Sequence, residues 1–258
     1  MKFRRALITG ASAGIGLACA EALAQQGLDL ILLARRQERL EKIQRDLRAR
    51  FEVDVVIGAV DIQERAQVEG FFKNHAVAAE SVDVLINNAG LAKGTAKFAD
   101  GDPRDWDVML DTNVRGLLYV TRALLPSMLK RPQAHIINMG SVAGRWVYPG
   151  GAVYCASKFA VRALSEGLRM DLQGSPVRVT NIEPGMVETE FSEVRMGDRE
   201  RAKAVYKGMQ PLSPQDIAES ILWCLARPAH VNIQELVIFP TDQAAIQMVQ
   251  RRESEKPV

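Results

Sequence analysis

The stretch RALITGASAGIG, residues 5–16, joins a short apolar run to a loop of three glycines and then leads into a long helix-like run. The loop has the spacing G-x-x-x-G-x-G and reads Gly10-Ala11-Ser12-Ala13-Gly14-Ile15-Gly16. Glycines permit a tight turn and a close approach of backbone to ligand, and the free N–H groups at a helix start attract phosphate. A strand, this loop and a helix in that order therefore predict a dinucleotide-binding unit, with a purely structural turn as the alternative.

The alternation of short apolar runs and longer amphipathic runs continues along the chain. Strand-like runs cover 5–9, 28–34, 53–59, 82–87, 135–139, 177–182 and 236–239, and helix-like runs cover 14–26, 37–50, 63–79, 103–129, 152–172 and 214–226. This pattern is typical of α/β folds in which helices cover both faces of a parallel sheet. We predict one domain over residues 1–258, a doubly wound, Rossmann-like parallel sheet of seven strands that binds its ligand at the strands' carboxyl ends.

One segment breaks this rhythm. Residues 189–210 are charged and only weakly periodic, and they lie between the sixth strand and the last long helix. A long polar insertion directly after a strand end predicts a lid over the ligand, and the alternative is a solvated helical excursion. Ser213 and Pro214 mark the start of the last helix. The tail after Pro240 is polar, and we expect its final residues to fray or to contact a neighbouring subunit.

The bulk composition excludes several classes of protein. With 25% charged residues and a net charge of +2, the chain is not expected to bind nucleic acid or a membrane surface. Its three cysteines, Cys19, Cys155 and Cys224, are widely spaced, which predicts reduced thiols and no disulfide framework. The N-terminus leads directly into a strand, and no apolar run reaches the roughly 18 residues of a membrane span. These features predict a cytoplasmic protein.

The end of the second strand bears on the choice of nucleotide. An acidic residue there would bind the adenosine ribose hydroxyls of NAD, but the sequence reads Ala34-Arg35-Arg36. Arg35 and Arg36 can instead bind a 2′-phosphate, and Ser12 can add a hydroxyl. The sequence therefore predicts NADP, with solvated arginines as the alternative.

Polar residues also follow the third and fourth strands. Asp61 and Ile62 end the third strand, and the spacing of Asp61 and Glu64 predicts a helix N-cap with a capping box. The fourth strand closes with Asn87-Asn88-Ala89-Gly90. Small and amide residues at this point suit a backbone packed against a flat ligand, and the alternative is an ordinary turn.

A tyrosine and a lysine suggest the chemistry. Tyr154 and Lys158 are four residues apart, so on a helix they lie on the same face, one turn apart. An ammonium beside a phenol lowers the phenol pKa from about 10, and such a phenol can exchange a proton with an alcohol or carbonyl oxygen. Ser141 lies thirteen positions before Tyr154. Together with a nucleotide cofactor, this set predicts hydride transfer.

Six sequence features carry a family resemblance. They are TGASAGIG at 9–16, NNAG at 87–90, Asn113, Ser141, Tyr154 with Lys158, and PGMVET at 184–189. In this order and spacing, across essentially the whole chain, they resemble the short-chain dehydrogenase/reductase family in its compact, single-domain form.

The resemblance implies a role for each matching residue. Tyr154 would be the general acid/base, Lys158 would lower its pKa and hold the nicotinamide ribose, and Ser141 would orient the substrate oxygen. Asn113 would support a water that links Lys158 to solvent. The implied cofactor contacts are Asp61 and Ile62 to adenine, Asn88 to the adenosine-side ribose, and Val187 and Thr189 to the nicotinamide carboxamide. The cofactor site also includes Ala89, Gly90, Pro184 and Gly185. Each residue also has a structural alternative. Ser141 could cap the segment that follows it, Asn113 could be an ordinary polar residue of a helix, and Thr189 could cap a helix in the lid. No metal is implied.

A narrower resemblance concerns the substrate. The stretches at 140–154, 177–195 and 228–243 resemble the 3-hydroxy acid dehydrogenase branch, whose members are NADP-dependent serine, L-allo-threonine or 3-hydroxypropionate dehydrogenases or malonic semialdehyde reductases. Arg195 in the lid and Arg145 after Ser141 could each bind a substrate carboxylate, or could form surface salt bridges. Trp146, Tyr148 and Met186 could line the pocket or belong to the core.

The sequence thus predicts an NADP-dependent oxidoreductase of short 3-hydroxy acids or their 3-oxo partners. Two alternatives stay open: a broad reductase of neutral ketones or aldehydes, and a non-catalytic NADP-sensing protein. The resemblance also implies a homotetramer in which the helices predicted at 103–129 and 152–172 pair between subunits.

Overall fold

A sheet of seven parallel strands forms the centre of the computed structural model, which describes residues 3–252. The strands are β1 (Arg5–Thr9), β2 (Asp29–Ala34), β3 (Val55–Ala59), β4 (Val84–Asn87), β5 (Ala134–Met139), β6 (Val177–Pro184) and β7 (Glu235–Ile238). Their order is β3-β2-β1-β4-β5-β6-β7. The predicted doubly wound, seven-stranded sheet is confirmed, and its order reverses between β1 and β4, where such sheets bind ligands.

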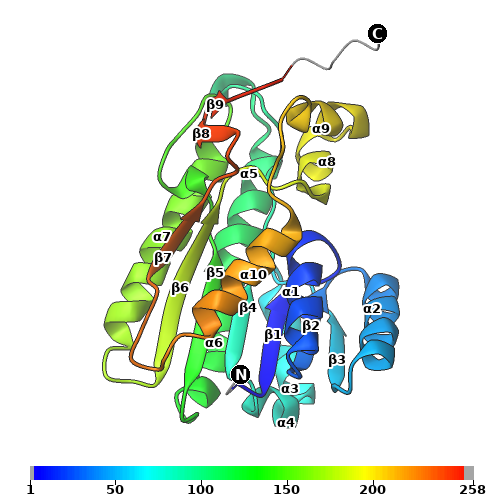
Figure 1. Cartoon of the computed structure of the whole chain (residues 1–258), viewed down its shortest axis with the longest axis vertical. Helices are drawn as coiled ribbons and strands as arrows, with labels where there is room; N and C mark the ends of the chain where they lie inside the picture. Colours follow the sequence, from blue (N-terminus) through cyan, green and yellow to red (C-terminus); the bar gives the residue numbers. More distant parts are fainter. Residues whose placement is uncertain (1–2, 253–258) are drawn as a thin grey trace.

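Helices cover both faces of the sheet (Figure 1). They are α1 (Gly14–Gln25), α2 (Gln37–Arg50), α3 (Arg65–Asn74), α4 (Ala76–Glu80), α5 (Pro103–Leu110), α6 (Leu117–Met128), α7 (Ala152–Asp171) and α10 (Pro214–Leu225). Helices α1 and α10 pack against each other on one face, whereas α3 and α4 pack against α6 on the other. Each face has its own apolar cluster because successive strand residues point to opposite sides.

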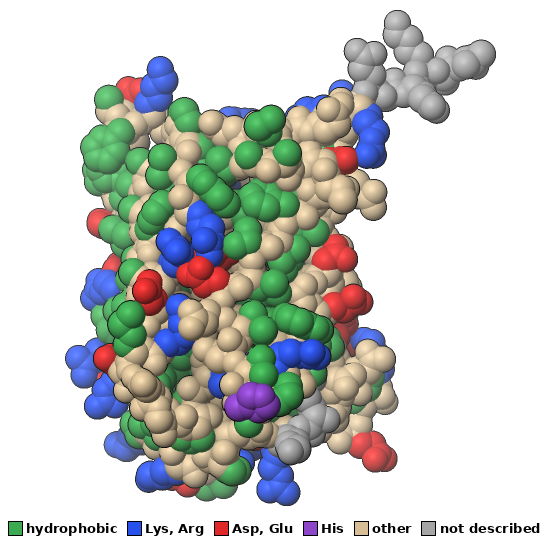
Figure 2. Space-filling model, turned by 60° about the vertical axis from the view of Figure 1, so that its left-hand side comes forward, with side chains coloured by type: hydrophobic (Ala, Val, Ile, Leu, Met, Phe, Trp, Pro, Cys, Tyr) green, Lys and Arg blue, Asp and Glu red, His purple; other side chains and the backbone are tan. Residues whose placement is uncertain are grey.

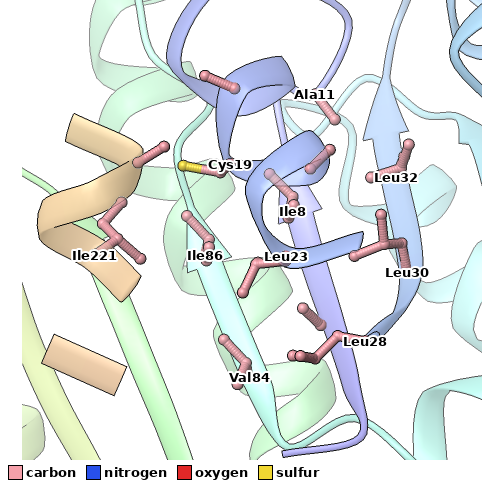
Figure 3. Close-up of a cluster of buried hydrophobic side chains, with 14 of the residues drawn as sticks. Ile8, Ala11, Cys19, Leu23, Leu28, Leu30, Leu32, Val84, Ile86 and Ile221 are labelled. Atoms are coloured by element: carbon pink, nitrogen blue, oxygen red, sulfur yellow. The ribbon is translucent and has the colours of Figure 1, made fainter. Parts of the chain in front are cut away.

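The cluster around α1 shows how this packing is achieved (Figure 3). Cys19 and Leu23 of α1 lie between Ile8 of β1, Ile86 of β4 and Ile221 of α10, all of them buried. Burial raises the pKa of the Cys19 thiol to about 12, which keeps it protonated and unreactive. All three cysteines are free and buried in the structure.

Two helix predictions need correction. The run predicted at 63–79 is divided into α3 and α4, and α3 begins at Arg65 after Glu64, with no side-chain cap. The predicted Asp61–Glu64 capping box is therefore wrong. The Asp61 carboxylate instead accepts a hydrogen bond from the backbone N–H of Gln63 at 3.1 Å, because an aspartate can close a local turn two residues on.

The run predicted as one helix at 103–129 contains a π-helical segment. This segment, η2 (Asp111–Gly116), connects α5 to α6 without a break. A wider helical turn changes which side chains face inward, and Asn113 in its middle is buried. Segments of this kind often occur at functional sites.

The predicted lid at 189–210 contains two short helices, α8 (Glu190–Met196) and α9 (Arg199–Tyr206). The tail after Pro240 forms a hairpin of β8 (Gln243–Ala245) and β9 (Met248–Val249), and both parts lie at the carboxyl end of the sheet (Figure 1). The backbone N–H of Arg252 donates to the carbonyl of Gly208, so the tail contacts the lid. The fraying expected of the final residues concerns 253–258, which lie outside the described residues.

Ser213 and Asp216 form a full capping box at the start of α10, with Pro214 in its first turn. Within residues 3–252, no helix combines the length and apolar character needed to cross a membrane.

Candidate functional site

A cavity of about 550 Å³ opens at the carboxyl ends of the strands. The loops after β1 to β6 contribute to its walls, as do residues of the predicted lid at 189–210. Most of the residues predicted for the site line it: Gly10, Ser12, Gly14, Ile15, Arg35, Arg36, Asp61, Ile62, Asn88, Ala89, Gly90, Ser141, Tyr148, Tyr154, Lys158, Pro184, Gly185, Met186, Val187, Thr189 and Arg195. Gly16, Asn113, Arg145 and Trp146 are not among the lining residues.

The glycine loop has the shape that a nucleotide requires. Gly10 and Gly14 have φ angles of 66° and 54°, which other residues rarely adopt. A Cβ atom on Gly16 would lie 2.4 Å from the carbonyl oxygen of Gly10, so this glycine allows α1 to start directly against the loop. The N-cap of α1 is Ala13, which has no side-chain cap, and the first N–H groups of the helix remain available to a phosphate.

The amide of Asn88 holds this loop against the end of β4. Its Nδ2 donates to the carbonyl oxygens of Thr9 at 3.0 Å and Gly10 at 3.3 Å. In return, the Thr9 hydroxyl accepts from the backbone N–H groups of Asn88 and Ala89. The two strand ends at the switch point are thus fixed to each other, which leaves a preformed cradle for a dinucleotide.

Arg35 and Arg36 follow the end of β2, and Arg36 contacts Ser12 of the glycine loop. Arg36 donates to the Ser12 hydroxyl oxygen from Nε at 3.1 Å and from Nη2 at 2.9 Å. Arg35 is 62% exposed, and its nearest carboxylate contact is Asp61 at 4.0 Å. Both arginines and Ser12 line the cavity, and guanidinium groups together with a hydroxyl form a donor set that suits a phosphate dianion.

Helix α7 places Tyr154 and Lys158 one turn apart on the wall of the cavity. Lys158 Nζ is 5.9 Å from the centroid of the Tyr154 ring and donates to the carbonyl of Met139 at 2.8 Å. Ser141, at the end of β5, accepts from the backbone N–H of Ala143 and begins the 3-10 turn η3 (Val142–Gly144). The cap expected as the alternative role of Ser141 is therefore present, and its hydroxyl still lines the cavity.

The ionisation of this pair differs from the sequence expectation. Burial raises the pKa of Tyr154, and the nearby Tyr148 adds to the rise, while Ser141 and Arg195 oppose it. Burial also lowers the pKa of Lys158 to about 8. Loss of hydration on burial is the main cause of both shifts, so the phenol is protonated at neutral pH.

Asn113 acts on the backbone of the loop after β4. Its Oδ1 accepts from the N–H of Leu91 and its Nδ2 donates to the carbonyl of the same residue, both at 2.9 Å. The Nδ2 also donates to the Ser157 hydroxyl at 3.0 Å. A Cβ atom on Gly90 would lie 3.2 Å from Asn113 Oδ1 and 3.4 Å from Lys158 Nζ, so this glycine allows both side chains to approach the loop.

The lid brings a cation to the catalytic candidates. Arg195 of α8 donates from Nη1 to the hydroxyl of Tyr148 at 2.9 Å, and its Cζ is 5.9 Å from the centroid of the Tyr154 ring. A second cavity of about 400 Å³ shares Tyr148, Tyr154 and Arg195 with the first. A substrate near Tyr154 would therefore lie beside a guanidinium group.

Two residues predicted to contact the substrate do not line the cavity. Arg145 donates from Nε to Glu183 and from Nη2 to Glu235, and it is absent from the cavity wall. Glu183 is fully buried, so its charge needs this cation, and Arg145 is not free to bind a substrate. Trp146 is 46% exposed, with its ring centroid 6.0 Å from that of Phe239, and it also lies outside the cavity.

Several residues that line the cavity belong to none of the sequence motifs. Thr112, Phe191, Tyr206 and Gln243 belong to this group. Phe191 follows the recognised PGMVET stretch and lies 5.6 Å from the Tyr154 ring between centroids. Gln243 comes from the tail, where its Oε1 accepts from the backbone N–H of Met186 at 2.9 Å. No local pattern marks Gln243, because only the return of the tail brings it to this loop.

Comparisons with known proteins agree with this geometry. The short chain dehydrogenase family matches residues 4–200. The NADP-dependent 3-hydroxy acid dehydrogenase of Escherichia coli strain K12 is 44% identical over 240 residues, which is 92% of this chain and 95% of that protein. Sulfoacetaldehyde reductase 2 of Chromohalobacter salexigens is 44% identical over 240 residues, covering 92% and 94%.

A solved structure of an NADP-bound dehydrogenase has a similar fold. The closed form of a serine dehydrogenase complexed with NADP+ superimposes with a TM-score of 0.89 at 42% identity, covering 96% of this chain and all of that one. The family match extends over most of the chain, and the glycine loop and the Ser141, Tyr154 and Lys158 set lie in one cavity. The chain therefore belongs to the short-chain dehydrogenase family.

Proposed function

We propose that the protein is an NADP-dependent oxidoreductase that transfers a hydride between the cofactor and a short 3-hydroxy acid or its 3-oxo partner. The observation that carries this proposal is the position of Arg195, whose guanidinium lies 5.9 Å from the Tyr154 ring in a cavity that also contains Ser141. A carboxylate two or three bonds from the reacting carbon would meet that cation. The names of the relatives and of the structural neighbour support the same substrate class.

We assign the cofactor site to the residues that line the cavity along β1 to β4 and after β6. Ser12, Arg35 and Arg36 would bind the 2′-phosphate, and the start of α1 with Gly10, Gly14 and Ile15 would bind the pyrophosphate. Asp61 and Ile62 would contact the adenine, Asn88, Ala89 and Gly90 the ribose, and Pro184, Gly185, Val187 and Thr189 the nicotinamide end. When bound, NADP supplies the hydride acceptor or donor. Gly16 supports this site by packing.

Tyr154 is the proposed general acid/base. Because burial raises its pKa, the phenol carries its proton at neutral pH, which is the form that donates to a carbonyl oxygen in reduction. In the reverse direction the phenolate accepts the alcohol proton, and Lys158 would stabilise that anion. Ser141 would hold the reacting oxygen. Asn113 is a positioning residue, since it fixes the backbone of Leu91 beside Lys158.

A Tyr154→Phe variant tests the proton transfer. A positioned acid/base contributes about 10²–10⁴ in rate, so turnover should fall by at least about 100-fold while NADP binding is unchanged. The measurement is NADP reduction at 340 nm alongside cofactor binding by calorimetry. Turnover within about tenfold of wild type would remove Tyr154 from the mechanism.

An Arg195→Ala variant tests the substrate class. Loss of the guanidinium should raise KM for serine or 3-hydroxypropionate by about tenfold or more and leave a neutral secondary alcohol almost unchanged. The matched control is Arg199→Ala, which removes a lid arginine that pairs with Glu193 at 3.6 Å. Equal effects on acid and neutral substrates would favour a broad carbonyl reductase instead.

A second candidate substrate carries a sulfonate. It is favoured by the 44% identity to a sulfoacetaldehyde reductase, since a sulfonate could occupy the same position beside Arg195. Including 2-hydroxyethanesulfonate in the assay separates the two anions. The higher kcat/KM would identify the better substrate.

We also propose that the protein forms a homotetramer and works in the cytoplasm. Hydrophobic side chains gather around a cluster of charged ones on the face shown in Figure 2, and helices α5 to α7 expose Leu110, Leu118, Phe159 and Met170. Such surfaces favour subunit contacts. Three free, buried cysteines suit a reducing compartment. Light scattering of the purified protein measures the subunit number, and a monomer would refute the assembly.

A further inference from the structure

We propose that Glu190, the first residue of α8, competes with the cofactor's 2′-phosphate for the arginines at the end of β2. The lid and the choice of nucleotide would then be linked through one carboxylate. This inference rests on the NADP dependence proposed above, and goes beyond it in assigning a role to a residue that belongs to neither the glycine loop nor the catalytic set.

The carboxylate of Glu190 receives one hydrogen bond on each oxygen. Arg36 Nη1 donates to Oε2 at 2.8 Å, and Arg39 Nη1 donates to Oε1 at 2.7 Å. Arg39 lies in the first turns of α2, three residues after Arg36, so a lid residue bridges two neighbouring guanidinium groups. Glu190, Ser12 and Arg36 all line the cavity.

The orientation of Arg36 shows why the two anions would compete. A guanidinium binds a phosphate best through two N–H groups on one edge. On Arg36, the edge formed by Nε and Nη2 faces the Ser12 hydroxyl, and the Nη1 end of the other edge donates to Glu190. A phosphate that engages either edge through two bonds must replace one of these partners.

Ser12 and Glu190 respond differently to such a phosphate. A serine hydroxyl is neutral and can rotate to donate to a phosphate oxygen. The Glu190 carboxylate cannot do so: although partial burial raises its pKa, the hydrogen bonds from Arg36 and Arg39 hold that pKa below its ordinary value of 4.5. At neutral pH it is an anion that repels a phosphate of charge −1.5 to −2. Glu190 is therefore the group that the phosphate displaces.

The position of Glu190 in the lid transmits this displacement. The Thr189 hydroxyl accepts from the N–H of Phe191 and caps α8, and the Thr189 side chain lies 3.3 Å from where a Gly14 Cβ would be. Glu190 thus lies at the start of the lid, next to a residue that packs beside the glycine loop. The same seven-residue helix carries Arg195 to Tyr154. By thermodynamic reciprocity, a contact that opposes phosphate binding is itself weakened when the phosphate binds.

The test compares two nucleotides that differ only in the 2′-phosphate, adenosine 2′,5′-bisphosphate and adenosine 5′-monophosphate. Binding to the full chain is measured by calorimetry at low salt for wild type, Glu190→Gln and Glu193→Gln. Glu193 is the matched control because it lies in the same helix and pairs with Arg199 rather than with the β2 arginines. Loss of a pair of exposed ionic contacts corresponds to about a fivefold change in affinity.

We expect Glu190→Gln to bind the bisphosphate about fivefold more tightly and the monophosphate within twofold of wild type, and Glu193→Gln to change neither. Unchanged or weaker bisphosphate binding by Glu190→Gln would overturn the proposal, as would equal tightening of both nucleotides. If wild type itself did not prefer the bisphosphate, the NADP assignment would fail, and the role of Glu190 with it. Because the test measures nucleotide binding and not turnover, it can be interpreted even if the proposed reaction is wrong.

Discussion

Replacing Arg145 by methionine would separate a structural role from a substrate-binding role. In the structure Arg145 donates to two carboxylates, Glu183 and Glu235, and Arg162 completes the cluster at 2.9 Å from Glu235 and 3.9 Å from Glu183. Glu183 is the decisive member because its side chain is 0% exposed, whereas that of Glu235 is 22% exposed. Burial raises the pKa of Glu183, and Arg145 is the main group that opposes the rise.

The size of the effect follows from what remains around Glu183. Removing one member of a buried ion pair costs ~3–5 kcal/mol because the other charge is left unpaired. Here Asn181 still donates to Glu183 at 2.8 Å and Arg162 is nearby, so we expect the lower part of that range or slightly less, about 2–3 kcal/mol. For a chain of this length that corresponds to a fall in Tm of about 4–12 °C.

The assay is urea unfolding of wild type, Arg145→Met and the double variant Arg145→Met/Glu183→Gln, together with steady-state kinetics. The double variant should recover part of the loss because it removes the unpaired charge. In the folded single variant, KM for a hydroxy acid and for a neutral alcohol should shift by the same factor. An unchanged free energy of unfolding with a selective rise in KM for the acid would refute this reasoning and restore Arg145 as a carboxylate ligand.

Two further predictions concern packing and pH. Gly16→Ala places a Cβ 2.4 Å from the Gly10 carbonyl oxygen, so it should destabilise the chain by ~1–3 kcal/mol and weaken NADP binding. The control Gly70→Ala lies in α3 with open space around it and should stabilise the chain by ~0.5–1 kcal/mol. Thermal unfolding measures the stability of both variants and calorimetry their NADP binding, and equal behaviour of the two would contradict the close packing at Gly16. Burial holds the pKa of His135 well below 6.5, so the folded chain keeps this imidazole neutral while the unfolded chain protonates as the pH falls. The free energy of unfolding should therefore decrease from pH 7 to pH 5, with His135 contributing up to ~2 kcal/mol. Urea unfolding of His135→Gln at several pH values should show a weaker dependence of stability on pH. An unchanged dependence would exclude His135 as its source.

Local patterns were sufficient for the sheet and for the cofactor loop. The seven strand runs, the glycine spacing at 10–16 and the residues that follow each strand end could all be identified, because parallel strands have a short apolar pattern and the tight turn needs glycine. Parallel strands place their carboxyl ends at one edge, so residues as distant in sequence as Ser12, Asn88 and Tyr154 could be predicted to meet. Helix interruptions were less predictable, since the π-helical turn at 111–116 has no clear local pattern.

The sequence by itself thus determined the fold and the edge of the sheet at which the cavity lies. It also identified Ser141, Tyr154 and Lys158 as the residues that meet there. Only the tertiary structure decided the partners of Arg145 and Glu190, which depend on contacts spanning 38 and 154 residues. It also decided the ionisation of Tyr154 and Lys158, because spacing along a helix sets the direction of an interaction, whereas burial removes the water that stabilises each charged form. Which charged groups pair and which side chains lose water are properties of the packed chain, and no local pattern contains them.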